Sequence, residues 1–338
     1  MKLIDTRDAV GQVLCHDITQ IIKGVTKDAV FRKGHIITEE DIPVLLSVGK
    51  DHIYVWENDE NVLHENEAAQ ILYDLCKCDN VHPSDVKEGK IEVIADCDGL
   101  LKVDSIKLKR VNSFGEMMIA GRHGNTIIKK GDKIAGTRII PLVISKEKMQ
   151  QAAQLGADGS IFKLIPFKSK RVGIITTGNE VFHKRIEDTF TPTILEKLSE
   201  FDTEVVYHEI FDDNPDKITK GILAAVAKGA EFVICTGGMS VDPDDRTPLA
   251  IKNTGADIIS YGAPVLPGAM FLLSYLDGVP VVGLPGCVMY ARRTIFDLVL
   301  PRIMADDLIT ADELAGLGEG GLCLNCPVCT YPNCGFGK

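Results

Sequence analysis

The sequence predicts an α/β protein, with a three-layer domain and a mostly parallel sheet over residues 170–305. Three observations support this fold class. Residues 171–177 form an apolar run typical of a parallel strand buried on both faces. The strands TEVVYHEI and EFVICTGG are each followed by a helix start, at Asn214-Pro215 and Thr247-Pro248. Three more strands then lead to a helix expected over 288–304.

The region before this domain is predicted to be strand-rich α+β. Thr38-Glu39-Glu40-Asp41 resembles a capping box that opens a helix, and Gly49 suits its C-terminal end. Residues 61–80 read as one amphipathic helix, with a break at 82–84. Residues 91–145 alternate like strands, with a turn at 98–99. We therefore expect four regions: 1–60, 61–165, 170–305 and a tail over 306–338.

Composition narrows the function class. The 338 residues are 45% hydrophobic and 25% charged, which is typical of a globular protein rather than a disordered one. The formal net charge of −11, with no basic stripe, argues against nucleic-acid binding. Apolar runs such as FVIC are too short to cross a bilayer, and no signal peptide is recognisable. We expect a cytoplasmic protein with no membrane partner, whose ten cysteines stay reduced.

Three acids follow the first three strands of the 170–305 domain. Glu180, Asp213 and Asp245 each come shortly after a strand ends. The C-terminal ends of parallel strands share one edge of the sheet, where ligands bind. Acids are also common after strands because loops are polar and helix starts favour them. Two glycine loops beside these acids, 176–178 and 236–238, strengthen the functional interpretation, because glycine allows a ligand close to the backbone.

This pattern favours a ligand that carries phosphate, together with Mg²⁺. Helix N-termini offer free N–H groups that bind phosphate. Carboxylates cannot bind phosphate directly, but they hold Mg²⁺, which bridges to phosphate oxygens.

The same residues resemble a known family. TTGNEV, FDDNPDKI, TGGMSVDPDDRTP, VLPG and GLPG occur in the order found in the molybdopterin-binding domain. That domain is shared by molybdopterin molybdenumtransferases, molybdopterin adenylyltransferases and competence-damage-type nucleotide hydrolases. The resemblance extends over about 122–304, and the first 60 residues resemble the molybdenumtransferases only at VGQVLCHDI and RKGHIITEEDI.

The resemblance implies a role for each matching residue. Glu180, Asp213 and Asp245 match the catalytic acids, and Asp213 and Asp245 would hold Mg²⁺ at the pyrophosphate of adenylated molybdopterin. Further positions match the loops that contact this cofactor: Thr176, Thr177, Gly178, Asp188, Thr236, Gly237, Gly238, Ser240, Pro285 and Gly286.

The sequence departs from the family pattern at several positions. The molybdenumtransferases usually carry two lysines as anion ligands, and here Leu266 and Ala269 stand in those places. Cys287 and Phe190 replace asparagines. Arg292 and Arg293 are candidates to replace the lysines as molybdate ligands, although arginines near a helix also have structural roles. Cys287 is more readily explained as a packing residue than as a ligand of the pterin.

The tail contains a compact group of four cysteines: Cys323, Cys326, Cys329 and Cys334. Few apolar residues surround them, so a bound metal would supply folding energy for this segment. The first two spacings match the bacterial ferredoxin run, but the last is one residue longer. An iron–sulfur cluster and tetrahedral Zn²⁺ are both open, as is a disordered tail with free thiols.

The function expected from the resemblance is molybdenum cofactor biosynthesis. A molybdenumtransferase would use Mg²⁺ to insert molybdate into adenylated molybdopterin and release AMP. The alternatives are a molybdopterin adenylyltransferase, a non-catalytic carrier or sensor of the cofactor, and a nucleotide pyrophosphate hydrolase. The expected partners are the pterin substrate, a molybdoenzyme or another cofactor-assembly protein, and a second copy of the chain in a homo-oligomer.

Overall fold

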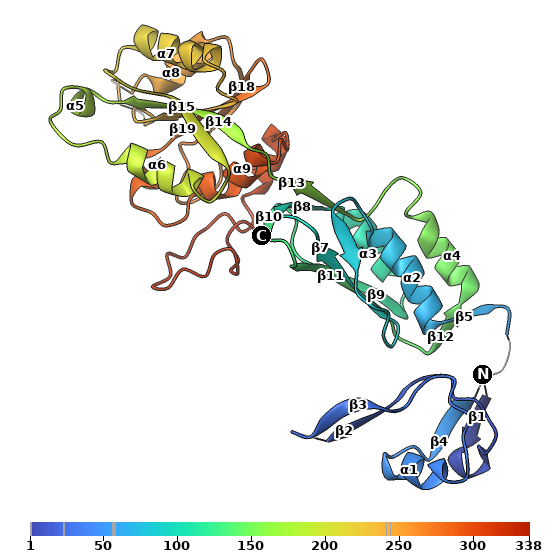
Figure 1. Cartoon of the computed structure of the whole chain (residues 1–338). Helices are drawn as coiled ribbons and strands as arrows, with labels where there is room; N and C mark the ends of the chain where they lie inside the picture. Colours follow the sequence, from blue (N-terminus) through green and yellow to red (C-terminus); the bar gives the residue numbers. More distant parts are fainter. Residues whose placement is uncertain (1, 23, 56–58, 241, 244) are drawn as a thin grey trace. The chain divides into compact units, whose positions relative to one another are not determined.

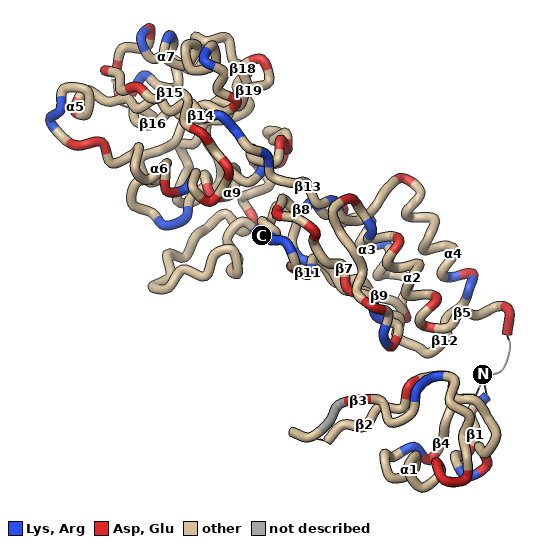
Figure 2. Tube along the Cα trace, in the orientation of Figure 1, with Lys and Arg blue, Asp and Glu red and all other residues tan. Residues whose placement is uncertain are grey.

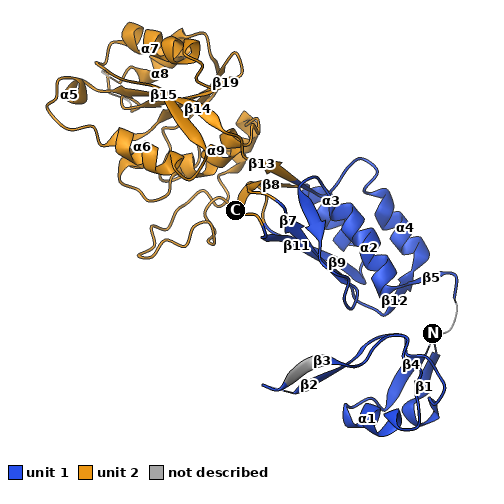
Figure 3. Ribbon diagram, in the orientation of Figure 1, with its two compact units in different colours: residues 1–96, 104–122, 131–163 blue, residues 97–103, 123–130, 164–338 orange. Residues whose placement is uncertain are grey.

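The chain folds into two compact units, each built from several stretches of sequence. The computed structural model describes residues 2–22, 24–55, 59–240, 242–243 and 245–338. Unit 1 comprises residues 1–96, 104–122 and 131–163, and unit 2 comprises 97–103, 123–130 and 164–338 (Figure 3).

The first part of unit 1 has two strand pairs around a small core. The pairs are β1 (Lys2–Asp5) with β4 (His52–Val55) and β2 (Ile18–Ile22) with β3 (Thr26–Phe31), beside η1 (Thr6–Asp8) and α1 (Asp41–Ser47). The helix begins at Asp41 and not at Thr38, because the Asp41 carboxylate accepts bonds from the Thr38 N–H and hydroxyl, both at 2.9 Å. Gly49 follows the helix with φ +78°, as predicted for its C-terminal end. Trp56, predicted in the strand HIYVW, lies outside the described residues.

The rest of unit 1 is a four-stranded antiparallel sheet, with three helices in the same unit. The sheet order is β6-β7-β11-β9, and a separate pair joins β5 to β12. The strands are β5 (Val62–His64), β6 (Val81–Pro83), β7 (Lys90–Ala95), β9 (Met117–Gly121), β11 (Lys133–Ile139) and β12 (Val143–Ser145). The helices are α2 (Glu65–Cys76), α3 (Ser105–Asn112) and α4 (Lys146–Gln154).

Three predictions for this region are wrong. The single helix over 61–80 is a short strand followed by α2, which starts at Glu65 because the His64 imidazole caps it. The expected break at 82–84 lies within β6, an edge strand, where a proline is tolerated. The alternating run after residue 104 is α3, because the Asp104 carboxylate accepts the Lys107 N–H at 2.8 Å and starts a helix.

Unit 2 contains the predicted three-layer domain with a mostly parallel sheet. The strand order is β15-β14-β16-β19-β18-β17, where the first four strands are parallel and the last two antiparallel. Its strands are β14 (Lys170–Thr177), β15 (Thr203–Phe211), β16 (Phe232–Thr236), β17 (Asp257–Tyr261), β18 (Leu272–Leu276) and β19 (Val279–Leu284). The helices beside it are α5 (Asn179–Phe182), α6 (Phe190–Leu198), α7 (Pro215–Ala227), α8 (Thr247–Asn253) and α9 (Ile295–Met304).

Helices cover both faces of this sheet, with α7 and α8 on one face and α6 and α9 on the other (Figure 1). Successive residues of β14 point to opposite faces, so Ile174 packs in the α6–α9 core and Ile175 in the α7–α8 core. Burial on both faces explains why these strands are continuously apolar. Each fully buried large side chain contributes about 1.5–3 kcal/mol to stability.

Two of the expected helix starts in unit 2 are confirmed and one differs. Asn214 caps α7, which begins at Pro215, by accepting the Asp216 N–H at 3.0 Å. Helix α8 begins at Thr247, as expected, and the Thr247 hydroxyl faces the sheet. The helix expected over 288–304 is the short turn η2 (Gly286–Met289) followed by α9, because Thr294 and Asp297 form a capping box that starts α9 at Ile295.

A small sheet in unit 2 joins three stretches of the chain. Its order is β10-β8-β13, from β10 (Thr126–Ile128), β8 (Gly99–Val103) and β13 (Phe162–Pro166). The turn predicted at Asp98-Gly99 therefore does not pair β7 with β8, since these strands lie in different sheets.

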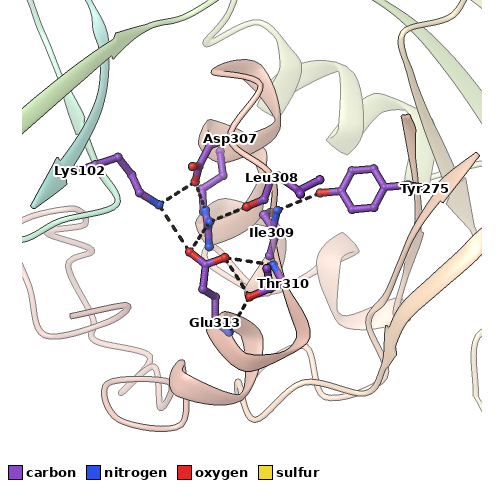
Figure 4. A network of polar contacts seen from close by, with 8 residues as sticks. Lys102, Tyr275, Asp307, Leu308, Ile309, Thr310 and Glu313 are labelled. Carbon is purple, nitrogen blue, oxygen red and sulfur yellow. Dashed lines mark hydrogen bonds and ion pairs between the residues drawn. The ribbon is translucent and has the colours of Figure 1, made fainter. Parts of the chain in front are cut away.

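The tail is ordered by packing and charge pairs. It contains α10 (Ala311–Gly316), which the sequence pattern had not indicated, and Phe336 is buried in the α6–α9 core. Figure 4 shows the network around α10, in which the Arg302 guanidinium bonds Asp307 and, at 2.7 Å, Glu313. The Lys102 ammonium completes this network, 2.8 Å from Asp307.

The distribution of charged residues and the lengths of the helices agree with the globular character that the composition predicts. Basic and acidic residues are interspersed along both units (Figure 2). Among the residues that the structure describes, no helix is long and apolar enough to cross a membrane.

Candidate functional site

Four loops begin at one level along the C-terminal edge of the unit 2 sheet. Thr177 of β14 pairs with Phe211 of β15, and Thr176 pairs with Thr236 of β16. Thr236 in turn lies opposite Leu284 of β19. The segments after these strands therefore share one edge, which confirms the predicted meeting of the loops.

A carboxylate joins the first two loops. The Asp213 carboxylate accepts the Asn179 backbone N–H at 2.9 Å, and the Asn179 side-chain oxygen faces the Asp213 N–H at 3.5 Å. Asp213 is half-buried by this contact. Glu180 is exposed on α5, and its carboxylate lies over Gly178, where a Cβ atom would come within 2.9 Å of Oε1.

Threonine hydroxyls join the first and third loops. The buried Thr177 hydroxyl lies 3.1 Å from the Thr236 carbonyl and 3.0 Å from the Thr247 hydroxyl. Gly237, with φ +84°, passes so close that an added Cβ would lie 2.2 Å from the Thr177 carbonyl. The Thr236 hydroxyl is buried and has no hydrogen-bond partner among the described residues. Only glycine fits this crossing of two loops.

The third loop is closed by its own acid. The Asp245 carboxylate accepts the Ser240 N–H at 2.8 Å, and the Tyr261 hydroxyl donates to the Met239 carbonyl at 2.9 Å. Burial, helped by the nearby negative charge of Asp245, raises the pKa of Tyr261, so this phenol stays a donor. The loop is thereby held against the sheet edge by one carboxylate and one phenol. Its Val241 and Asp244 lie outside the described residues.

A further polar chain runs from β14 to the start of α6. The Thr191 hydroxyl bonds the Asp188 carboxylate and lies 3.1 Å from both the Thr176 hydroxyl and the His208 ring. Asp188 also accepts the backbone N–H groups of Phe190 and Thr191, at 2.9 and 3.1 Å. Asp188 therefore caps α6, which is a structural role for this predicted binding residue.

Two cavities lie beside η2. One of about 350 Å³ is formed by the 290–293 segment and the tail, and the other of about 370 Å³ by the same segment and α6. The segment 290–293 and Cys329 line both cavities. These hollows therefore flank the loop after β19, and they do not include the residues of the β14 and β16 loops.

Comparison with known proteins shows which family model matches the part of the chain that forms this sheet. Residues 173–305 match the family model described as "Probable molybdopterin binding domain". This part of the chain matches the molybdopterin-binding domain family. Residues 3–57 match a model described as "Domain of unknown function (DUF8806)".

Relatives of known sequence match only in part. The molybdopterin molybdenumtransferase of Haemophilus influenzae is 28% identical over 185 residues, which cover 52% of this chain and 43% of that protein. The molybdenum cofactor biosynthesis bifunctional protein of Synechococcus elongatus is 34% identical over 83 residues, covering 25% of this chain and 26% of that one. A CinA-like protein of Mycobacterium sp. is 34% identical over 83 residues, with 25% and 20% covered. The chain thus spans less than half the length of these relatives.

Solved structures also resemble the chain. The molybdopterin biosynthesis enzyme MoaB of Thermus thermophilus has a TM-score of 0.35 at 24% identity, over 42% of this chain and 98% of that one. A molybdenum cofactor biosynthesis protein of Pyrococcus furiosus has a TM-score of 0.26 at 14% identity, over 93% of this chain and 64% of that one.

The molybdopterin-binding domain brings most of the predicted residues to one edge. They come from the ends of β14, β15, β16 and β19 and the loops after them: Thr176, Thr177, Gly178, Glu180, Asp213, Thr236, Gly237, Gly238, Ser240, Asp245, Pro285 and Gly286. In the described part of the chain, however, no three acidic, thiol or imidazole side chains converge as a metal site. The three predicted acids are therefore not a ready-made Mg²⁺ site, and among the described residues the four tail cysteines do not converge on a single metal ion.

Sequence reasoning missed three residues of this edge. Asn179, Thr191 and Thr247 make the bonds that tie the loops of the molybdopterin-binding domain together. Thr247 lies in the motif DDRTP and Asn179 in TTGNEV, so the motifs contained the signal. Their contacts span 15 to 70 residues of sequence, which no local pattern reveals.

The two arginines near η2 differ in what they contact. Arg293 lies 2.8 Å from the Asp297 carboxylate and 4.8 Å from the Tyr331 ring, which gives it a structural role. Burial opposes its charge, but the bond to Asp297 outweighs this and raises the pKa of Arg293. Arg292 is exposed and donates to the Pro327 carbonyl at 2.9 Å, which is a neutral acceptor. Arg292 is thus the better placed of the two to meet an anion.

Proposed function

We propose that the molybdopterin-binding domain holds adenylated molybdopterin along the edge described above and acts in molybdenum cofactor biosynthesis. The finer proposal is a molybdenumtransferase reaction, in which molybdate enters the pterin and AMP is released. The observation that carries it is that Thr177 and Asp213 bond neighbouring loops together while Asp245 closes its own loop, because these bonds pre-organise glycine backbones and carboxylates at one edge.

Phosphate binding at this edge has a physical basis in the backbone. Helix α7 has 13 residues and begins directly after Asp213, with Asn214 as its cap. Its N-terminus carries partial positive charge and favours an anion. Gly237 and Gly238 are half-buried at the sheet edge, where Thr177 and Thr247 occupy the space that their Cβ atoms would need, so the two loops hold their backbone in place beside the proposed anion site.

The donor set fits Mg²⁺, although the ion would need the substrate to complete its shell. Asp213 and Asp245 supply the carboxylate oxygens that Mg²⁺ prefers, and proteins commonly hold this ion by one or two carboxylates plus substrate phosphates. Bound there, the ion would neutralise charge on the pyrophosphate. Hydrolysis adds one water across the phosphoanhydride, so one P–O bond breaks and both products keep a phosphate. Glu180, exposed beside Gly178, is proposed to orient that water.

The direct test is AMP release from adenylated molybdopterin under anaerobic conditions, with Mg²⁺ and with or without molybdate. Asp245→Asn keeps an oxygen that accepts the Ser240 N–H but removes the charge, so we expect the fold to persist. Release of AMP should fall at least about 100-fold, a size typical of the loss of one charge-stabilising group. Asp257→Asn, an exposed acid on β17, is the matched control and should keep full activity. Unchanged AMP release by Asp245→Asn would contradict the proposed molybdenumtransferase reaction. ATP consumption without adenylated substrate would favour the adenylyltransferase.

A second candidate, a carrier or sensor of the cofactor, is supported by one observation. Leu266 and Ala269 are exposed where the resemblance places two anion-binding lysines. The Leu266 backbone instead pairs with the tail, its N–H donating to the Gly321 carbonyl at 2.8 Å. Tight binding of the pterin with no AMP release, with or without molybdate, would establish this second function.

A further inference from the structure

The four tail cysteines line one cavity. The hollow of about 350 Å³ beside η2 is bounded by the 290–293 segment, by Tyr331 and Phe336, and by all four thiols of the tail: Cys323, Cys326, Cys329 and Cys334. Residues outside the tail therefore close the space that these cysteines enclose.

The two ends of the cysteine segment are fixed to the domain. The Cys323 N–H donates to the Leu266 carbonyl at 2.8 Å, and Leu266 forms a parallel bridge with Leu322. At the other end, Phe336 is buried, and the Gly337 N–H donates to the Gly320 carbonyl at 2.9 Å, which closes the loop. Cys323 and Cys334 pack against the core, whereas Cys326 and Cys329 are exposed on the arm between them.

The charge around the cavity suits thiolates. Residues 320–337 include no charged side chain, so no carboxylate of the segment itself opposes a second negative group. Arg292 and Arg293 line the cavity from the domain side, and the Arg293 guanidinium hydrogen-bonds the Cys329 side chain. Arg293 is already paired with Asp297, whereas Arg292 donates to a neutral carbonyl, so the Arg292 charge would compensate thiolate charge at the wall.

We propose that this cavity binds one 4Fe–4S cluster through four thiolate ligands: Cys323, Cys326, Cys329 and Cys334. A single Zn²⁺ needs sulfurs about 2.3 Å from the metal and hence about 4 Å from each other. In the described residues no three thiols form a group that could hold a single metal ion. A four-iron cluster offers a separate iron to each thiolate and so tolerates sulfurs farther apart than one Zn²⁺ does, and the spacing of the first three cysteines matches a bacterial ferredoxin run.

The cluster would lie beside the loop after β19. The segment 290–293 lines both this cavity and the neighbouring one of about 370 Å³. This inference does not depend on the proposed reaction, because its test measures iron and sulfide rather than AMP.

The experiment is anaerobic reconstitution of the full chain with ferrous iron, sulfide and a thiol reductant. We expect about four irons and four acid-labile sulfides per chain, and an electron paramagnetic resonance signal after reduction by dithionite. The exposed pair is changed in Cys326→Ser with Cys329→Ser, which should lose at least three quarters of the bound iron and sulfide. Cys78→Ser, a half-buried cysteine outside the tail, is the matched control and should keep both.

Two results would overturn the proposal. One is tight uptake of a single Zn²⁺ per chain with no sulfide incorporated when iron and sulfide are offered together. The other is full iron and sulfide content in the doubly substituted chain. Iron and sulfide are measured in the unaltered protein in the same series. Zn²⁺ uptake without sulfide is scored in that protein, and full iron and sulfide content in the doubly substituted chain requires a folded variant, so poor folding conceals neither result.

Discussion

The edge of the unit 2 sheet has two sides that are built differently. The motif side comprises the loops after β14, β15 and β16, and its bonds join threonine hydroxyls, backbone groups and single carboxylates. The tail side comprises residues 264–269, 286–297 and 320–338, and buried ion pairs and the docked tail hold it together. Most departures from the family pattern lie on the tail side: Leu266, Ala269 and Cys287.

This difference shows where the fold constrains the sequence. On the motif side, a Cβ atom on Gly237 would collide with the neighbouring loop, so the residue type follows from backbone geometry. On the tail side, residue 266 contributes mainly backbone bonds to the tail, and its side chain is 55% exposed. A side chain there can change without breaking the sheet edge. New chemistry is therefore easier to introduce on the tail side.

The largest effect is expected from the buried charges of the tail side. The Asp297 carboxylate, 4% exposed, lies 2.7 Å from the Lys197 ammonium and 2.8 Å from the Arg293 guanidinium. Asp297→Ala removes the carboxylate paired with buried Lys197, leaves Arg293 with Glu200 at 3.6 Å and removes the acceptor of the Thr294 N–H. It should lower the free energy of unfolding by about 3–5 kcal/mol. Urea denaturation measures this loss, and Asp257→Ala on the exposed strand β17 serves as the control. A loss below about 1 kcal/mol, the range of exposed ion pairs, would contradict the comparison.

The next effect concerns backbone geometry on the motif side. Gly237 and Gly255 both have φ near +85°, but an added Cβ meets the Thr177 carbonyl at 2.2 Å in the first and nothing within 4 Å in the second. Gly237→Ala should cost about 3 kcal/mol of stability, because strain and a backbone clash add. Gly255→Ala should cost only about 1 kcal/mol, from the unfavourable φ alone.

Equal losses in the two alanine variants would mean that the loops of the motif side can move apart freely. In that case the crossing of the β14 and β16 loops would not fix their geometry. Thermal unfolding of both variants under one buffer condition is sufficient to decide.

A smaller effect is expected at the hydroxyl that links two motif loops. Thr177→Val removes the bonds to the Thr236 carbonyl and the Thr247 hydroxyl while keeping the shape of the side chain. The free energy of unfolding should fall by about 1–3 kcal/mol, because buried polar groups lose a partner. Thr177→Ser retains the hydroxyl and should recover more than half of the loss. If the serine variant is as unstable as the valine variant, packing and not hydrogen bonding holds this site.

The smallest effect is a pH dependence around α10, next to the tail side. Burial opposes the charge of Glu313, but the Thr310 N–H and the Arg302 guanidinium outweigh it and hold the pKa of Glu313 below its usual 4.5. A lowered pKa in the folded chain adds stability above pH 4.5 that is lost as pH falls through the folded value. Glu313→Gln should therefore show a shallower loss of stability between about pH 5 and pH 3 in acid denaturation. Identical acid denaturation profiles for the unaltered protein and Glu313→Gln would contradict a contribution of Glu313 to the pH dependence of stability.

Local patterns predicted the parts of the fold that local physics determines. The apolar run of β14 and the Asn-Pro start of α7 are readable because burial on both faces and helix capping act within a few residues. The start of α9 was misplaced, since Thr294 and Asp297 cap it inside an otherwise helical pattern. Helix α3 was missed because its charged face alternates like a strand and only Asp104 marks its beginning.

The candidate site was predictable in part for the same reason. Asp213 and Asp245 follow strands, so their place at the edge follows from the parallel sheet. The link from Thr177 to Thr247 spans 70 residues and depends on the folded register, which the sequence does not display. The backbone bonds between Leu266 and the tail join segments more than 50 residues apart, and no periodic pattern in the sequence predicts them.

Unit 2 is built from three separate stretches of the chain, and this affects what a single proteolytic cleavage can separate. The chain passes between the two units five times, because unit 2 takes residues 97–103 and 123–130 as well as 164–338. A protease that cuts the chain once, just before β13 near residue 160, therefore releases neither fragment, because β8 precedes the cut and pairs with β13 after it. Domain exchange at this single position would likewise divide one sheet between two polypeptides. The two units therefore cannot be separated by one cut in the chain.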